Sequence, residues 1–132
     1  MEHLGIVLKF LVAIGGSIVS YLYGSFDSIL MIFTILVAID YVSGILASGF
    51  EGKLSSQIGY KGIAKKIMIF ALIAVAHFVD QLVGNNHLIR DATIFFYMAN
   101  EILSIIENAS RLGIPVPDFL KKAVTLLQNK SK

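Results

Sequence analysis

Residues 28–50 read SILMIFTILVAIDYVSGILASGF, and this stretch decides the fold class. It is long enough to cross a bilayer, because a helix needs about 20 mostly apolar residues to span a hydrocarbon core of roughly 30 Å. Asp40 is its one charged residue. The stretch therefore predicts a membrane-spanning helix that carries a carboxylate near its middle.

Three further stretches have a similar length. Residues 4–24 contain one charge, Lys9, and residues 67–84 contain one, Asp80. Residues 88–106 are the least apolar of the four, so this segment either spans the membrane or lies at its surface. The polar residues in that segment include Arg90, Asp91, Asn100 and Glu101.

The overall composition agrees with a membrane protein. Hydrophobic residues make up 56% of the 132-residue chain and charged residues 15%, whereas soluble domains average about 25% charged residues. A soluble fold of this size could not bury so much apolar surface. We predict one all-α membrane domain over residues 1–132, with four transmembrane helices and an amphipathic C-terminal helix over 118–128. The lipid bilayer is the expected partner, and the net charge of +2 is too small to indicate nucleic-acid binding.

The distribution of lysines predicts the orientation. The connection 49–66 and the tail after Arg111 are both rich in lysine, and cytoplasmic loops carry an excess of Lys and Arg. These two segments fall on the same side of the membrane only if two spans separate them. A chain of four spans meets this condition, with the connection 49–66 and both termini on the cytoplasmic side. We therefore expect both termini in the cytoplasm.

Residues that would support catalysis or metal binding do not cluster in the sequence. There is no cysteine, and the three histidines are scattered. No serine, histidine and acid grouping indicates nucleophilic catalysis, and no ligand spacing indicates a metal site. We expect no enzymatic activity, no cofactor and no metal.

Charged residues inside a span need partners, since an isolated charge in hydrocarbon is costly. Lys9 lies 15 residues before Gly24, and Asp40 lies 13 residues after Asp27. In an antiparallel hairpin these two charges come to similar depth, which predicts a Lys9–Asp40 pair. The alternative is that Lys9 extends to the cytoplasmic boundary of the membrane.

The same counting across the turn 84–87 predicts that Asp80 lies near Arg90. It also predicts that Lys65 or Lys66 lies at the same depth in the membrane as Glu107. Glu101 has no level partner by this counting.

Polar residues recur every three to four positions along the fourth segment, so they share one side of a helix. They are Asn100, Glu101, Ser104, Glu107 and Asn108. In a membrane such a stripe must face protein or water. It forms either a polar seam between helices, or an end that emerges into the cytoplasm, or the lining of an oligomeric opening.

Small residues at four-residue spacing predict faces for close helix packing. They are Gly16, Ser20 and Gly24 in the first span and Gly44 and Ser48 in the second.

Several blocks resemble the toxin-secretion/phage-lysis holin family over residues 29–127. The blocks are Lys53-Leu54-Ser55-Ser56, Gly59-Tyr60-Lys61-Gly62-Ile63, Tyr97-Met98-Ala99-Asn100-Glu101 and Gly113-Ile114-Pro115-Val116-Pro117. The resemblance implies a protein of the bacterial inner membrane, encoded by a phage or prophage. It implies a homo-oligomer that forms lesions, times host lysis and lets an endolysin or a toxin pass out. We also consider two rivals: a small ion or proton channel using Asp40, His77 and Asp80, and a membrane anchor that recruits a partner through residues 118–132.

Overall fold

The computed structural model of the chain describes residues 1–131, and this part folds into five α-helices. The helices are α1 (Glu2–Tyr23), α2 (Ser28–Phe50), α3 (Ser56–Val83), α4 (Leu88–Arg111) and α5 (Asp118–Lys130). The all-helical prediction is confirmed. Three helices, α1, α2 and α3, are long and apolar enough to cross a membrane, whereas α4 is not by composition alone.

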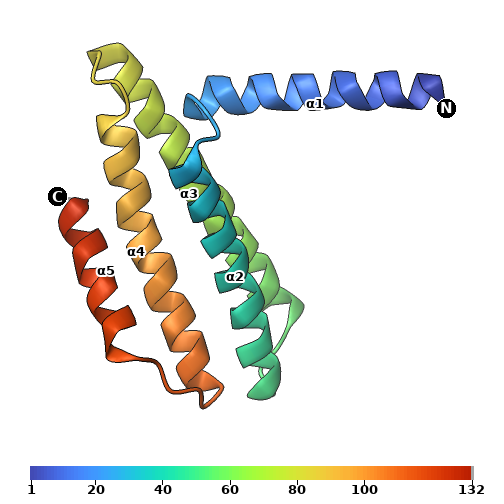
Figure 1. Ribbon diagram of the computed structural model, residues 1–132. Coiled ribbons are helices and arrows are strands. Elements are labelled where there is room, and N and C mark those ends of the chain that lie inside the picture. The colour runs from blue at the N-terminus through green and yellow to red at the C-terminus, as the bar shows by residue number, and fades with distance from the viewer. Residues whose placement is uncertain (132) are drawn as a thin grey trace.

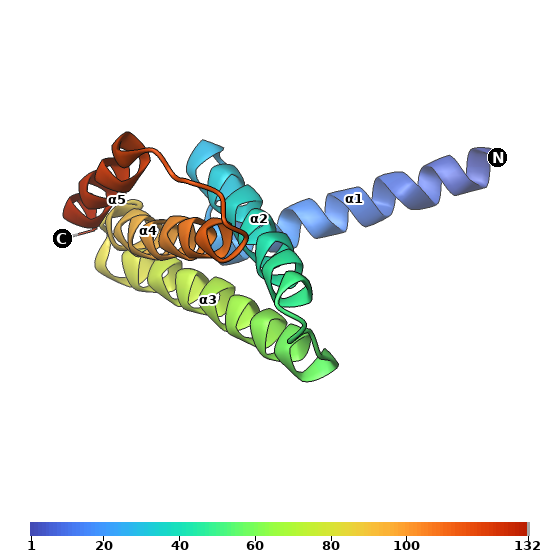
Figure 2. The ribbon, with the colours of Figure 1, turned by 90° about the horizontal axis from the view of Figure 1, so that it is seen from below.

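Helices α2, α3 and α4 form a bundle, and α5 packs along α4 (Figure 1). Helix α4 contacts α2, α3 and α5 and is therefore the central element. Helix α1 projects away from the other four helices in both views (Figures 1 and 2). Its end meets α3, but none of its residues is buried.

The ends of the helices follow from particular residues. The side chains of Asp27 and Ser55 accept hydrogen bonds from the backbone N–H groups of Leu30 and Ile58, and so cap α2 and α3. Helices α1 and α3 end at Gly24 and at a second glycine, Gly84, both with positive φ. Glycine adopts this conformation without the steric cost that a side chain imposes.

The apolar core lies between α2, α3 and α4. It consists of Leu30, Phe33, Val37, Ile73, Ile94 and Met98. Phe33, Ile73 and Ile94 are completely inaccessible to solvent. Each helix contributes to this layer, so one continuous apolar cluster lies between the three helices.

Helix α2 has the bounds of the predicted stretch 28–50, whereas α3, α4 and α5 extend beyond the stretches predicted from the sequence. Helix α3 begins at Ser56, before the predicted span 67–84, and contains that apolar stretch up to Val83. Most of the predicted 49–66 connection is therefore helical. Hydropathy detects only the apolar part of a helix, whereas the Ser55 cap starts α3 well before that part. Helices α4 and α5 likewise continue past their predicted ends to Arg111 and Lys130.

The turn at Gly24 gives a first prediction. A Cβ atom added at Gly24 would lie 2.5 Å from Cε1 of His87 and 2.9 Å from Cε1 of His77, whereas one added at Gly84 meets nothing within 4 Å. Both glycines have similar φ values, 86° and 83°. Gly24→Ala should therefore lower the unfolding temperature of the detergent-solubilised protein more than Gly84→Ala, which carries the backbone strain alone. Equal losses for the two variants would show that the histidine contacts are unimportant.

Candidate functional site

The ammonium group of Lys66 on α3 lies between two carboxylates inside the bundle. Its Nζ is 2.7 Å from Oδ2 of Asp40 on α2 and 2.9 Å from Oε2 of Glu101 on α4. The side chains of Lys66, Asp40 and Glu101 are 17%, 9% and 4% exposed. One cation therefore connects three helices at a depth where an unpaired carboxylate would be costly.

Asn108 on α4 extends this network toward the end of α2. Its amide Nδ2 donates to Oδ1 of Asp40 at 3.1 Å and to the hydroxyl of Ser43 at 2.9 Å. Its amide oxygen accepts from Arg111 at 3.2 Å. Arg111 in turn pairs with Glu51 at 2.6 Å. We call the connected set Asp40, Ser43, Lys66, Glu101 and Asn108 the Lys66 network.

The Lys66 network corrects two predictions. The Lys9–Asp40 pair was wrong, because α1 leaves the bundle and Asp40 instead faces α3 and α4. The prediction that Glu101 lacks a partner was also wrong. Counting from the turn 84–87 placed Lys66 near Glu107. The ammonium group of Lys66 instead lies deeper in the bundle, between Asp40 and Glu101, because buried carboxylates need a cation.

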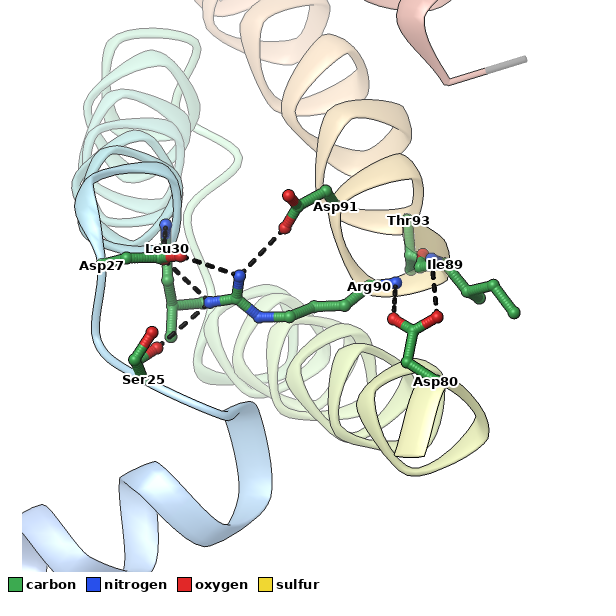
Figure 3. Close-up of polar contacts among 8 residues, drawn as sticks. All are labelled: Ser25, Asp27, Leu30, Asp80, Ile89, Arg90, Asp91 and Thr93. Atoms are coloured by element: carbon green, nitrogen blue, oxygen red, sulfur yellow. Dashed lines mark hydrogen bonds and ion pairs between the residues drawn. The ribbon is translucent and has the colours of Figure 1, made fainter. Parts of the chain in front are cut away.

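A second charged cluster surrounds Arg90, whose side chain is completely buried (Figure 3). Its guanidinium makes two hydrogen bonds to the carboxylate of Asp27, at 2.8 and 2.9 Å. It also donates to Asp91 at 2.9 Å and to the backbone carbonyl of Ser25 at 3.1 Å. Arg90 thus ties the α1–α2 turn to the first turn of α4.

Asp80 lies next to Arg90, as predicted, but the contact is made to the backbone. Its carboxylate accepts from the N–H groups of Ile89 at 2.9 Å and Arg90 at 2.7 Å (Figure 3). A carboxylate at this position accepts hydrogen bonds from free N–H groups at the start of α4. Its negative charge also interacts favourably with the positive end of the helix dipole. The guanidinium of Arg90 pairs with Asp27 rather than with Asp80.

The predicted polar stripe of α4 is divided between two environments. Glu101 and Asn108 are buried and belong to the Lys66 network, and Ser104 is half-buried. Asn100 and Glu107 are exposed. Within a single chain, Asn100 and Glu107 are therefore the members of the stripe that are most accessible to water or another molecule.

The predicted packing residues also differ in their surroundings. A Cβ atom added at Gly44 would lie 3.5 Å from Asn108, so this glycine stands where α2 and α4 meet. Gly24 forms the turn against two histidines. Gly16 and Ser20 are exposed on α1 and are available only to other molecules.

Sequence reasoning missed the partners of the buried charges, Lys66 and Asp27. Lys66 was assigned to a connection because it lies just before an apolar run. Asp27 lies directly before an apolar run, and an Asp in that position is a signal for a helix cap. The cap was therefore readable from the sequence, whereas the ion pair with Arg90 was not.

The Lys66 network gives a second prediction. Lys66→Met should lower the free energy of unfolding by about 3 kcal/mol, since it leaves two buried carboxylates without a cation. Unfolding of the solubilised protein in a denaturing detergent measures the loss. The control is Lys65→Met, which removes a neighbouring exposed lysine. If the two variants are equally stable, the network does not hold the bundle together. Adding Asp40→Asn and Glu101→Gln to Lys66→Met should recover much of the lost stability.

The Asp27–Arg90 pair gives a third prediction, on pH. The Arg90 guanidinium lowers the pKa of the Asp27 carboxyl below its usual value. A lowered carboxyl pKa stabilises the fold above the ordinary pKa of about 4, and this stabilisation is lost as the pH falls through the lowered value. The unfolding temperature of Asp27→Asn should therefore fall less than that of the natural protein between pH 5 and 2. Asp118→Asn, on the exposed start of α5, should retain the natural acid dependence. If Asp27→Asn retains it too, the pair contributes nothing to acid sensitivity.

Comparisons with known proteins relate the chain to bacterial and phage proteins. The chain is 46% identical, over 96% of its length and 90% of the relative's, to an uncharacterised protein of Listeria monocytogenes. It is 38% identical to a protein of Bacillus subtilis, over 91% of this chain and 90% of that one. It is 28% identical to a probable holin of Bacillus phage phi105, over 83% of this chain and 81% of that one. No solved structure matches the chain.

The relationship also holds at the level of the family. Residues 17–129 match the bacteriophage holin family, so the match takes in all of α2, α3 and α4 and nearly all of α5. The chain therefore belongs to the bacteriophage holin family, a family of non-enzymatic membrane proteins.

Proposed function

We propose that the protein is a holin that oligomerises in the bacterial cytoplasmic membrane and forms lesions through which an endolysin or a toxin leaves the cell. Membership of the holin family supports the class. The observation that carries the mechanism is the position of α5. This amphipathic helix runs along α4, which separates it from the apolar helices α2 and α3 (Figures 1 and 2).

The arrangement of the bundle favours a fourth membrane crossing by α4. Helix α4 lies against both α2 and α3, which have the composition of spans. Its most costly polar residues, Arg90, Glu101 and Asn108, are buried inside the bundle. The charges that lower the hydropathy of α4 therefore need not face lipid, so its composition does not oppose a crossing.

The lysines favour a cytoplasmic position for the end of the bundle where α2 meets α3. Lys53 and Lys61 lie at this end, and α4 also ends there. Under the positive-inside rule the connection 51–55 is cytoplasmic and the turn 84–87 faces outward. With α1 as a further span, the N-terminus is also cytoplasmic. Helix α5 starts at the cytoplasmic end and returns along α4, where Nζ of Lys130 lies 5.2 Å from the ring centre of Phe95. In this orientation the last turn of α5 lies toward the outward end of the bundle, which differs from the expected cytoplasmic C-terminus.

This orientation places polar residues of α4 and α5 at membrane depth. Asn100 and Glu107 are exposed on α4, and Lys121 and Lys122 are exposed on α5. Polar side chains at that depth need protein or water. In an oligomer, the surface formed by α4 and α5 can line a water-filled opening while the apolar residues of α1, α2 and α3 contact lipid. Gly16 and Ser20 on the free helix α1 are proposed contacts between copies.

The two rival functions are less well supported. A proton path through Asp40, His77 and Asp80 would have to cross an apolar layer whose exposed fractions are 1% or less; this layer consists of Leu30, Phe33 and Ile73. That apolar layer offers no group that can carry a proton. A membrane anchor would need a free C-terminal helix, but α5 is packed on α4.

Inducible expression in bacteria tests the proposed function. After a delay, membrane potential should collapse and a folded cytoplasmic reporter enzyme should appear in the medium when the cell wall is opened. Loss of potential with the reporter retained would favour the ion channel. If the membrane potential stays intact throughout, both the holin and the ion channel are contradicted, and the membrane anchor is favoured.

Single cysteines test the lining of the opening, and the natural chain has no cysteine to interfere. A water-soluble maleimide added from outside should label Asn100→Cys and Glu107→Cys only after the membrane potential has collapsed. Leu46→Cys, on the exposed apolar side of α2, should remain unlabelled because lipid covers it. Labelling of Leu46→Cys, or protection of both α4 positions in open lesions, would contradict the proposed lining.

A further inference from the structure

A polar pocket of about 380 Å³ opens where α2 ends and α3 begins. Its lining comes from α2, α3 and α4. Four cationic side chains, Lys61, Lys65, Lys66 and Arg111, line it together with one carboxylate, Asp40. This charge pattern favours an anionic occupant.

Two of the four cations are free to bind a ligand. Lys66 and Arg111 are already held by carboxylates. Lys61 and Lys65 form no ion pair within residues 1–131. They lie four residues apart, which places them on the same side of α3. One anionic group in the pocket can therefore contact both lysines.

An apolar groove adjoins this pocket. It has a volume of about 700 Å³, lies between α2 and α3, and shares Tyr41 and Lys66 with the polar pocket. On α3 its lining runs from Ile63 to Phe78, a distance of about 22 Å at the rise of an α-helix. The hydrocarbon of one leaflet is only about 15 Å thick. The groove is therefore long enough for an acyl chain.

We propose that the pocket and the groove together bind one anionic glycerophospholipid of the cytoplasmic leaflet. Its phosphate lies between Lys61 and Lys65, and one acyl chain lies in the groove between α2 and α3. Basic pockets between transmembrane helices on the cytoplasmic side favour anionic lipid headgroups. The site also combines a charged end with an apolar end, as a lipid does. The proposal rests on the membrane orientation given above but not on lesion formation.

Native mass spectrometry of the purified full-length protein in detergent tests the proposal, with dioleoylphosphatidylglycerol as the probe. The variant Lys61→Gln/Lys65→Gln should bind this lipid roughly 30-fold more weakly, because two headgroup contacts are lost. The control Lys121→Gln/Lys122→Gln makes the same change of charge on α5 and should bind like the natural protein. If the α3 variant binds normally, or if the α5 control loses as much affinity, the site is not the one proposed.

A second pair of variants tests the groove without changing charge. Ala71 lines the groove, and Ala64 is exposed on α3 outside both cavities. Ala71→Phe should weaken lipid binding, whereas Ala64→Phe should not. Equal affinities for these two variants would contradict the acyl-chain position.

A competition arm distinguishes a lipid from free phosphate. Inorganic phosphate at millimolar concentration should not displace the lipid, and dihexanoylphosphatidylglycerol should bind more weakly than the long-chain lipid. Displacement by phosphate alone would overturn the proposal in favour of a free anion site. Because binding is measured without any permeability assay, a failure here leaves the proposed holin function untouched, and a failure to lyse cells leaves lipid binding testable.

Discussion

The ion pairs of Lys66 with Asp40 and Glu101 are the contacts on which the arrangement of the bundle depends. Each of the three side chains comes from a different helix, and each would be costly to bury alone. Helices in lipid gain little from apolar contact, because lipid tails are as apolar as the side chains they replace. A shared buried cation therefore specifies which helices pack together. Arg90 does the same at the other end of the bundle, where it joins the α1–α2 turn to α4.

The two charged clusters also explain the distribution of polarity. Because they face inward, α2 and α3 can present apolar side chains outward, and α4 can lie beside them despite its charges. Exposed polar residues remain on the outer sides of α4 and α5, while α1 has no buried residue. A molecule with one apolar side and one amphipathic side is suited to surrounding an aqueous opening. The polar pocket at the start of α3 adds a place where the same bundle can hold an anionic lipid.

The helices were more predictable from the sequence than their contacts were. Residues 28–50 have the length and hydropathy of a span, and α2 has those bounds. The closeness of Asp80 and Arg90 followed from counting across a short turn. The partner of Asp40 could not be predicted in this way, because counting assumes that consecutive helices pack as hairpins. The first helix instead points away from the bundle, since its turn is held by Arg90 and by the contacts of Gly24 with two histidines. The polar residues of α4 likewise divide into buried and exposed ones. Their helical spacing predicts that they share one side of the helix, but it does not predict which of them another helix covers.

The orientation of the α2–α4 bundle across the membrane is the central claim, and labelling of two single cysteines in intact cells tests it most directly. Asn85→Cys lies in the turn between α3 and α4, and Lys53→Cys lies in the connection between α2 and α3. Before any loss of membrane potential, an impermeant maleimide added outside should label Asn85→Cys and should not reach Lys53→Cys until the cells are opened. Labelling of Lys53→Cys from outside, or of both positions equally, would contradict the account.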